Sequence, residues 1–261
     1  MAAHMPVVFV SHGAPDALIN APDAVALWSE IGQLAPEPAA ILVVSAHWEA
    51  RLPTASLSSS PETLHDFSGF PPELYRMDYR ARGAPALAER VASLLATAGL
   101  PAELHPARGL DHGAWVPLSA MYPQADVPVT QLSLVRSASP ASHFELGRAL
   151  APLREEGVLI VGSGAITHNF SWLDGRAKPD KAPLPQAQEF NDWVAARLAA
   201  QDIRSLLAYR SAPHGAEAHP TEEHFLPLLV AFGAGNGATP VRYRPGFSYG
   251  SLSMDAYLWR D

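Results

Sequence analysis

The chain has 261 residues, of which 48% are hydrophobic and 17% charged, a composition typical of a globular protein with one well-buried core. Its 18 basic and 26 acidic residues give a formal net charge of -8 with no basic cluster, which argues against nucleic acid or an anionic membrane as the main partner. The absence of Cys excludes disulfides, thiolate metal sites and thiol nucleophiles. A small-molecule substrate is favoured, and any metal must be bound by His, carboxylate or water.

The sequence also bears on location. No apolar run approaches the ~20 residues of a membrane span, and the N-terminus lacks the charged and then apolar pattern of a secretory signal. We therefore expect a cytoplasmic protein. The stretch from Met1 to Met5 is interpreted as a short extension before a second start, so His4 is given no role.

Hydrophobic patterning predicts alternating strands and helices. Short β-branched runs bounded by turn-forming or polar residues predict buried strands at residues 7–10, 41–44, 129–134 and 158–161. Longer helical stretches are predicted at residues 21–34, 84–98, 141–153, 186–200 and 222–232. Such alternation is typical of a sheet with helices on both faces. The expected fold class is α/β, with residues 1–261 as a single catalytic domain around a central, largely parallel or mixed sheet.

Three of the predicted strands run directly into polar turns that contain a histidine. His12 follows the first strand, His47 follows the second, and His168 follows the strand at 158–161. The carboxyl ends of the strands in an open parallel sheet line the ligand crevice, so the three imidazoles are expected to converge there. A single histidine in such a turn is more often bonded to backbone, but the repeated placement favours a shared site.

His224 is a fourth candidate. Thr221 is a plausible N-cap for the last predicted helix, which would place Glu222, Glu223 and His224 in the first turn. The positive end of the helix dipole disfavours imidazolium, and a neutral His224 could bind a metal. From the local pattern alone, a solvent-facing histidine is equally compatible.

His112 is a fifth candidate, in the turn Asp111-His112-Gly113 before Trp115. Its role would be acid–base chemistry or substrate contact, with Asp111 orienting the ring and Gly113 permitting a close backbone approach. The same tripeptide is also common in ordinary turns.

Two motifs suggest other enzyme classes and are rejected. Gly162-Ser163-Gly164 follows a strand, but Thr167 occupies the position of the third glycine of a dinucleotide-binding loop. The segment 246–250 matches the G-x-S-x-G pattern of serine hydrolases, but no histidine follows it to complete the expected order. A P-loop motif is also absent from the sequence.

The motifs together resemble the LigB-type, or class III, extradiol ring-cleavage dioxygenases, and within them the 4,5-DOPA extradiol dioxygenase branch of bacteria and plants. The resemblance spans nearly the whole chain, and seven motifs in the same order are far more specific than any one of them. They are S-H-G-A-P at 11–15, S-A-H-W at 45–48, H-D-F-S-G-F-P at 65–71, D-H-G-A-W at 111–115, G-S-G-A-I-T-H-N at 162–169, P-T-E-E-H-F-L-P-L at 220–228 and G-S-L-S-M at 250–254.

The resemblance implies a role for each histidine. It implies that His12, His47 and His224 bind one divalent metal, expected to be Fe(II) for activity, with Zn(II) possible in the purified protein. His168 resembles the acid–base histidine of the family, and His112 resembles a histidine that contacts the catechol. The wider class III pattern is two His and one Glu, whereas here the third ligand corresponds to His224, with Glu223 beside it and His219 nearby.

The implied reaction inserts O2 into a catechol-type ring beside its two hydroxyls, giving a ring-opened semialdehyde. Four aromatic residues near the motifs are candidates for contacting the ring, although they could equally pack in the core: Phe67, Phe70, Tyr75 and Trp115.

Two alternatives stay open from the residues alone. Three histidines and a water also make a good catalytic zinc site, which would suit a hydrolase. A non-catalytic metal-binding or ligand-binding protein would need neither an acid–base histidine nor a free coordination position.

Overall fold

The computed structural model describes residues 4–35, 37–173 and 182–260. Its strands are β1 (Val7–Ser11), β2 (Ala40–Ala50), β3 (Thr54–Ser56), β4 (Glu103–His105), β5 (Val129–Val135), β6 (Val158–Gly164), β7 (Val241–Tyr243), β8 (Phe247–Ser248), β9 (Leu252–Ser253) and β10 (Ala256–Trp259). Its α-helices are α1 (Ala17–Asn20), α2 (Pro22–Leu34), α3 (Pro85–Thr97), α4 (His112–Met121), α5 (Pro140–Leu150), α6 (Pro185–Ala199), α7 (Ile203–Leu207), α8 (Gly215–Ala218) and α9 (Leu226–Ala234).

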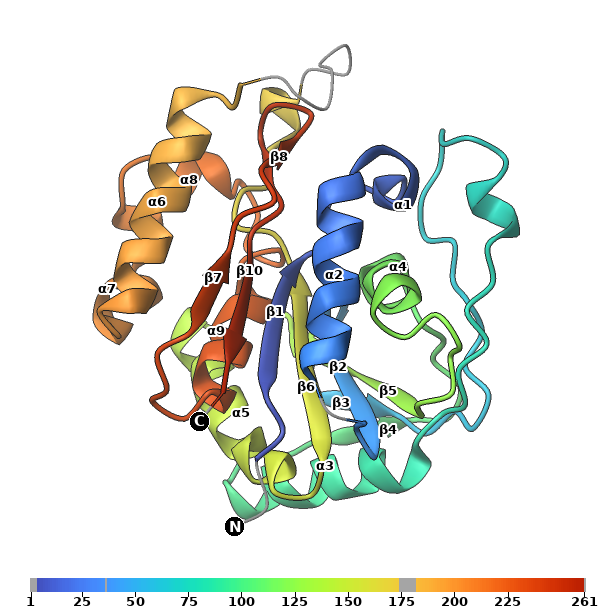
Figure 1. The fold of residues 1–261 in the computed structure, drawn as a ribbon. Helices are drawn as coiled ribbons and strands as arrows, with labels where there is room; N and C mark the ends of the chain where they lie inside the picture. The colour runs from blue at the N-terminus through green and yellow to red at the C-terminus, as the bar shows by residue number, and fades with distance from the viewer. Residues whose placement is uncertain (1–3, 36, 174–181, 261) are drawn as a thin grey trace.

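A mixed sheet forms the centre of the molecule (Figure 1). Among the described residues it has eight strands in the order β4-β3-β5-β2-β6-β1-β10-β7. The inner strands β5, β2, β6 and β1 are parallel to one another. At the two sides of this group, β10 pairs antiparallel with β1 and with β7, and β3 pairs antiparallel with β5. The predicted α/β class with a largely parallel or mixed sheet is confirmed.

The four predicted strands are the parallel centre of this sheet. Their carboxyl ends lie at one edge because each runs in the same direction as its neighbour. The outer strands β3, β4, β7 and β10 were not predicted, and they are only three or four residues long. So short a run gives no clear period-two pattern, and sheet pairing rather than local propensity defines it.

Helices cover both faces of the sheet (Figure 1). Successive residues of β1 alternate between the two layers, with Val8 and Val10 packed toward α2 and α4. Val7 and Phe9 pack on the other side, in the cluster that contains residues of α3, α5, α6 and α9. No helix in the described ranges is long and apolar enough to cross a membrane.

Prolines set the start of several helices. Pro22, Pro85, Pro140 and Pro185 are each the first residue of a helix, where the missing N–H costs nothing and the fixed φ favours the helical turn. Ser139 also caps α5 by accepting a hydrogen bond from the Ser142 N–H. The helices predicted at 21–34, 84–98 and 186–200 agree with α2, α3 and α6 to within one residue at each end.

Other helix predictions differ from the structure. The helix predicted at 141–153 corresponds to α5, which ends at Leu150, and to a 3-10 helix at Ala151–Arg154. Helix α4 was not predicted, because its residues are apolar on nearly every side and show no helical periodicity. The last helix was predicted from Glu222, but α9 begins at Leu226, and the Thr221 hydroxyl donates to the Glu223 side chain instead of capping the helix.

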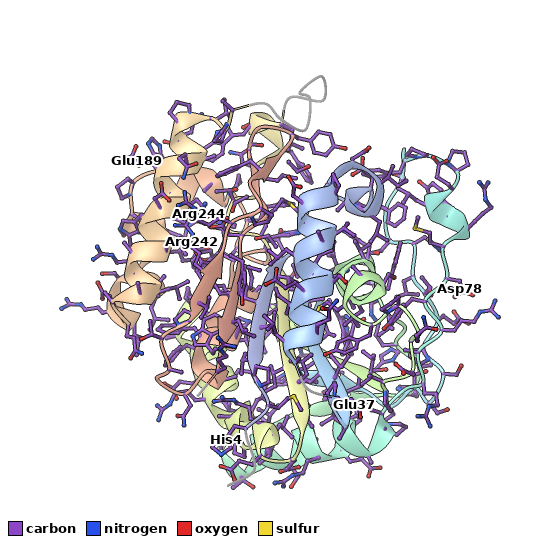
Figure 2. All side chains as sticks on the ribbon, in the orientation of Figure 1. His4, Glu37, Asp78, Glu189, Arg242 and Arg244 are labelled. Carbon is purple, nitrogen blue, oxygen red and sulfur yellow. The ribbon has the colours of Figure 1, made fainter. Side chains whose placement is uncertain are left out.

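An ion-pair network joins α6 to the C-terminal strands. Figure 2 labels Arg242, which lies on β7 beside α6. Its Nε donates to Oδ2 of Asp255 at 2.7 Å and its Nη2 to Oδ1 of Asp192 at 3.1 Å. Because Asp255 is buried, this arginine neutralises a carboxylate that water does not reach.

The glycines of β6 let the segment around α9 lie directly on the sheet. A Cβ on Gly162 would lie 2.4 Å from the carbonyl oxygen of Pro227, and one on Gly164 would lie 2.2 Å from that of His224. The Gly162-Ser163-Gly164 motif is therefore a close-packing surface, which agrees with the rejection of a dinucleotide-binding loop.

We predict that Gly164→Ala lowers the free energy of unfolding by about 3 kcal/mol, because the clashing atom belongs to the backbone. Gly237→Ala is the control, since φ there is +83° but nothing lies within 4 Å of the added Cβ. It should cost only about 1 kcal/mol of left-handed backbone strain. Urea denaturation of both variants measures the difference, and equal losses would contradict the steric explanation.

Candidate metal centre

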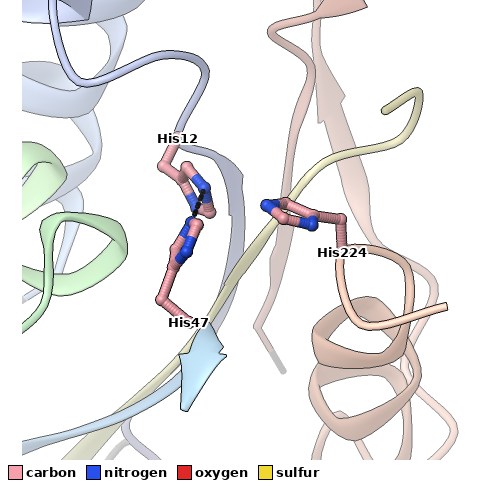
Figure 3. A group of neighbouring side chains, drawn as sticks. All are labelled: His12, His47 and His224. Carbon is pink, nitrogen blue, oxygen red and sulfur yellow. Dashed lines mark hydrogen bonds between the residues drawn. The ribbon is translucent and has the colours of Figure 1, made fainter. Parts of the chain in front are cut away.

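Three histidines from separate elements meet at the carboxyl edge of the sheet. His12 follows β1, His47 lies in the last part of β2, and His224 lies just before α9, with the rings facing one another in Figure 3. The Nε2 atoms of His12 and His47 are 3.1 Å apart, and each of the three residues offers a nitrogen within 4.8 Å of the others. The structure thus brings together the three predicted ligands.

An irregularity in β2 places His47 at this site. Val44 pairs with Leu132, but Glu49 already pairs with Leu134, so the intervening residues of β2 are bulged out of the ladder. The strand was predicted to end before His47, whereas it continues to Ala50. A bulge redirects side chains, and here it coincides with the candidate ligand.

Burial keeps these rings neutral. Burial is the largest cause that lowers the pKa of His12 well below its usual range, and the nearby His47 adds to it. The pKa of His47 is lowered to about 3, by burial first and by His112 second, although Asp66 opposes the shift. Burial and the adjacent His168 lower the pKa of His224. A neutral imidazole has the lone pair that a metal requires.

The neutral state of His224 has a different cause from the one predicted. A place in the first turn of a helix was predicted to keep the ring neutral, but His224 precedes α9, and burial is the largest cause that lowers its pKa. Its Nδ1 lies 3.0 Å from Oε1 of Glu223, so the carboxylate can accept the Nδ1 proton and leave Nε2 free. Glu223 is therefore a partner of His224.

The donor set fits a divalent metal. A metal that binds two imidazole nitrogens at about 2.1 Å holds them about 3.0 Å apart when they occupy adjacent positions of an octahedron. The separation of 3.1 Å between the Nε2 atoms of His12 and His47 agrees with this spacing. Three neutral imidazoles suit iron or zinc better than magnesium or calcium, which prefer oxygen ligands.

Asp66 links two histidines of the site and was not singled out from the sequence. Its Oδ1 accepts hydrogen bonds from the backbone N–H of His112 at 2.9 Å and from Nδ1 of the same residue at 3.0 Å. Its Oδ2 lies 3.7 Å from Nδ1 of His47. Burial alone would raise the pKa of Asp66, but the hydrogen bonds from His112 lower it to about 2, so the carboxylate is ionised. It belongs to a long loop, whose path no local pattern predicts.

A second, fully buried carboxylate supports the start of α4. Asp111 accepts hydrogen bonds from the Ser45 hydroxyl at 2.6 Å and from Nε2 of Gln131 at 2.8 Å. Burial raises the pKa of Asp111, and these bonds oppose the shift. The predicted role of Asp111 in orienting the His112 ring is wrong, because Asp66 holds that ring while Asp111 ties α4 to β2 and β5.

The predicted close approach at Gly113 is confirmed. A Cβ there would lie 2.4 Å from Oγ of Ser45 and 3.2 Å from Cε1 of His12. Only glycine lets α4 come so near to the candidate ligands.

His168 lies beside the three histidines, against His224. The two rings stack with centroids 3.4 Å apart and an angle of 6° between their planes. Burial lowers the pKa of His168, Glu223 opposes the shift, and His112 adds to it. Stacking this close favours two neutral rings, because two imidazolium rings would repel each other.

A cavity of about 380 Å³ opens onto these residues and has a mainly apolar lining. Phe67 and Phe70 line it, as predicted, together with His47, His112, His168 and His224. Several further lining residues were not predicted as substrate contacts, although some of them belong to the motifs at 11–15, 65–71 and 250–254: Gly13, Ala14, Pro15, Asp66, Phe170, Leu173, Tyr249 and Leu252.

The other two predicted substrate contacts do not line this cavity. Trp115 is completely buried in α4, where its Nε1 donates to the carbonyl of Leu64. Tyr75 packs against Phe67, with ring centroids 5.1 Å apart, and its hydroxyl accepts from the N–H of Phe70. Both residues support the loop that carries Phe67 instead of facing the cavity.

Buried neutral histidines make stability depend on pH. Besides His47, burial lowers the pKa of His219 to about 3, and Nε2 of this residue bonds to the Ile166 carbonyl at 2.8 Å. An unfolded histidine has a pKa of about 6.5, so between these values the unfolded chain binds more protons. Stability is therefore complete above pH 6.5 and declines as the pH falls toward 3.

We predict that the free energy of unfolding of the metal-free protein falls between pH 7.5 and 5 by up to about 1.4 kcal/mol per pH unit for each such histidine. His219→Gln should show a slope smaller by about one proton, because its amide does not titrate and can still donate to Ile166. Urea denaturation at several pH values measures both slopes. Identical slopes would contradict the role of His219.

Comparison with known proteins agrees with this site. A family model described as the catalytic LigB subunit of aromatic ring-opening dioxygenase matches residues 1–253. The chain is 42% identical to the 4,5-DOPA dioxygenase extradiol of Escherichia coli K12, over 96% of this chain and 93% of that protein. It is also 42% identical to the protein of the same name from Beta vulgaris, over 95% and 94% of the two chains.

A solved structure shows the same fold. The crystal structure of the uncharacterized protein JW3007 from Escherichia coli K12 matches with a TM-score of 0.82 and 38% identity, covering 97% of this chain and 99% of that chain. The predicted enzyme class, an extradiol ring-cleavage dioxygenase, is confirmed by the family match and by the relatives. The chain belongs to the LigB family of aromatic ring-opening dioxygenases.

Proposed function

We propose that this enzyme opens a catechol-type ring beside its two hydroxyls, with one divalent metal bound by His12, His47 and His224. The observation that carries the proposal is the cluster of three neutral imidazoles, whose nitrogens lie within 4.8 Å of one another, with His47 and His224 at the wall of an apolar cavity. Three protein ligands leave coordination positions free for small ligands, as in the three-residue sites of non-haem iron oxygenases.

Fe(II) is the proposed metal. When bound, it would supply a Lewis acid for the catechol oxygens and the redox chemistry that O2 insertion needs, whereas zinc has no redox chemistry. Family membership therefore favours iron over zinc, because the family opens aromatic rings. No contact in the described residues specifically favours the zinc hydrolase that the sequence left open.

His168 is proposed as the acid–base group. A catechol must lose a proton to bind a metal well, and a neutral histidine can accept it. His168 lines the cavity, and burial keeps its pKa low enough for the ring to be neutral near pH 7. Its stacking on His224 places it next to a candidate ligand, where a substrate hydroxyl would lie. The same nitrogen can return the proton after the ring has been oxygenated.

His112 is proposed to contact the substrate. Its Nδ1 bonds to Asp66, and a carboxylate oxygen can only accept, so Nδ1 carries a proton. Nε2 is therefore the atom left to contact a catechol oxygen. Asp66 fixes the orientation of this ring and reaches toward His47, so one carboxylate aligns a proposed substrate contact with a proposed ligand.

The substrate is proposed to be a catechol whose ring lies among Phe67, Phe70 and Phe170. Aromatic side chains bind a ring through offset-stacked and edge-to-face contacts. L-DOPA is the first candidate, because relatives that cover nearly the whole chain are named for it. Nucleic acid and membranes are not proposed as partners, and the predicted cytoplasmic location is part of the proposal.

We predict that only Fe(II) supports turnover. Metal-free protein is loaded anaerobically with Fe(II) or Zn(II), mixed with L-DOPA, protocatechuate or unsubstituted catechol, and then exposed to O2. Oxygen uptake and a yellow semialdehyde are expected with Fe(II) alone, because zinc has no redox chemistry. His47→Ala is the control, and it should bind little metal. Absence of uptake with every catechol, or equal uptake with zinc, would overturn the proposal.

We predict that His168→Gln keeps its metal but loses turnover by about 10²–10⁴-fold, the usual contribution of a general acid–base group. His12→Ala should instead lose the metal itself. Metal analysis and oxygen uptake separate the two effects. A more acidic catechol such as 4-nitrocatechol should be less sensitive to His168→Gln, because it is already ionised. A fully active His168→Gln would show that the assignment is wrong.

A further inference from the structure

Helix α4 leaves one backbone carbonyl without a partner of its own. The carbonyl of Gly113 would normally accept from the N–H of the residue four positions later. That residue is Pro117, which has no N–H. Gly113 is buried, so water does not replace the missing donor, and a buried carbonyl requires another one.

Ser163 supplies the missing donor. Its hydroxyl donates to the Gly113 carbonyl, and the side chain is fully buried. Ser163 lies between the two close-packing glycines of β6 and points to the opposite face of the strand, toward α4. A serine hydroxyl has one proton, and a carbonyl can only accept, so this bond fixes the direction of the hydroxyl.

His12 completes the chain of hydrogen bonds. Its Nδ1 lies 2.9 Å from Oγ of Ser163. Because the hydroxyl proton is already directed to Gly113, Oγ can only accept here, and Nδ1 must carry the proton. A neutral imidazole has one N–H, so Nε2 carries the lone pair, and Nε2 is the atom that lies 3.1 Å from Nε2 of His47.

We propose that Ser163 is a positioning residue that holds His12 in the Nδ1–H tautomer before any metal binds. The benefit of this tautomer for metal binding rests on the proposed function, whereas the hydrogen bonds that hold it do not. It adds to the usual rule that a ligand histidine donates its other N–H to an acceptor. His47 and His224 have carboxylates near Nδ1, those of Asp66 and Glu223.

A hydroxyl suits His12 better than a carboxylate would. His12 is only 1% exposed, the least exposed of the three proposed ligands. A charge placed deeper in the protein would carry a larger desolvation cost. Ser163 adds no charge. Its hydroxyl donates its proton to the Gly113 carbonyl, and its oxygen accepts the Nδ1 proton of His12. The tautomer of His12 thus depends on Pro117 of α4, because the missing N–H of this proline leaves the Gly113 carbonyl to accept from Ser163.

The test reads the tautomer directly in the metal-free protein. Long-range ¹H–¹⁵N spectra of ¹⁵N-histidine-labelled protein distinguish a protonated ring nitrogen from one with a lone pair, and His12→Gln assigns the signals. We expect Nδ1 of His12 to be protonated and Nε2 to carry the lone pair. Ser163→Ala should shift His12 toward the Nε2–H form, which an unconstrained histidine side chain prefers.

Two matched variants separate positioning from a general structural effect. Ser163→Thr keeps the hydroxyl and should keep the tautomer. Ser45→Ala removes a buried hydroxyl at the position of β2 that pairs with Ser163 across the sheet. It should leave the tautomer of His12 unchanged, because the hydrogen bonds of Ser45 go to Asp111 and to the His47 N–H instead. Circular dichroism verifies that each variant is folded.

Metal affinity is the second measurement, with Zn(II) as a redox-silent probe in competition with a chelator. Ser163→Ala should raise the dissociation constant about 10–100-fold, the usual effect of losing such a partner, and Ser163→Thr should restore it. The proposal is overturned by a wild-type His12 protonated at Nε2, by an unchanged tautomer in Ser163→Ala, or by an unchanged affinity. The spectra need neither metal nor substrate, so they remain decisive even if the enzyme opens no catechol.

Discussion

The site depends on one constraint: several imidazoles must share a small, mostly dry space without becoming charged. Burial and mutual repulsion lower the pKa values of His12, His47 and His224, so each presents a lone pair near neutral pH. The same burial requires an acceptor for each remaining N–H. Glu223 and Ser163 lie within hydrogen-bond distance of Nδ1 of His224 and of His12, and Asp66 lies 3.7 Å from Nδ1 of His47. The arrangement directs the lone pairs of His12 and His224 to their Nε2 atoms before a metal arrives.

Close backbone packing makes this crowding possible. Gly113 brings α4 against the histidines on one face of the sheet, and Gly162 and Gly164 bring the segment around α9 onto the other. The bulge of β2 then adds His47 from the adjacent strand. None of these features carries out chemistry, but together they let groups from distant parts of the chain occupy one position. The ordinary parallel sheet beneath supplies only the common edge.

The sequence predicted which histidines lie at the carboxyl edge of the sheet, but not the loop and helix residues around them. His12, His47 and His168 were predictable because parallel strands end at one side of the sheet. His224 needed the family resemblance, since its segment is an irregular turn. Asp66 lies in a loop whose path depends on tertiary contacts. Trp115 was wrongly predicted to contact the substrate, because an aromatic residue near a motif can face either the cavity or the core. The residues of α4 show no helical periodicity that would distinguish the two orientations.

Phe170 gives the cavity a property that its histidines do not. This side chain is 74% exposed and yet lines the cavity, so a bound aromatic ring would remove it from water. Burial of apolar surface lowers the heat capacity of the complex relative to the free partners. The enthalpy of substrate binding therefore becomes more favourable on warming. Salts that are excluded from apolar surfaces would strengthen the same contact.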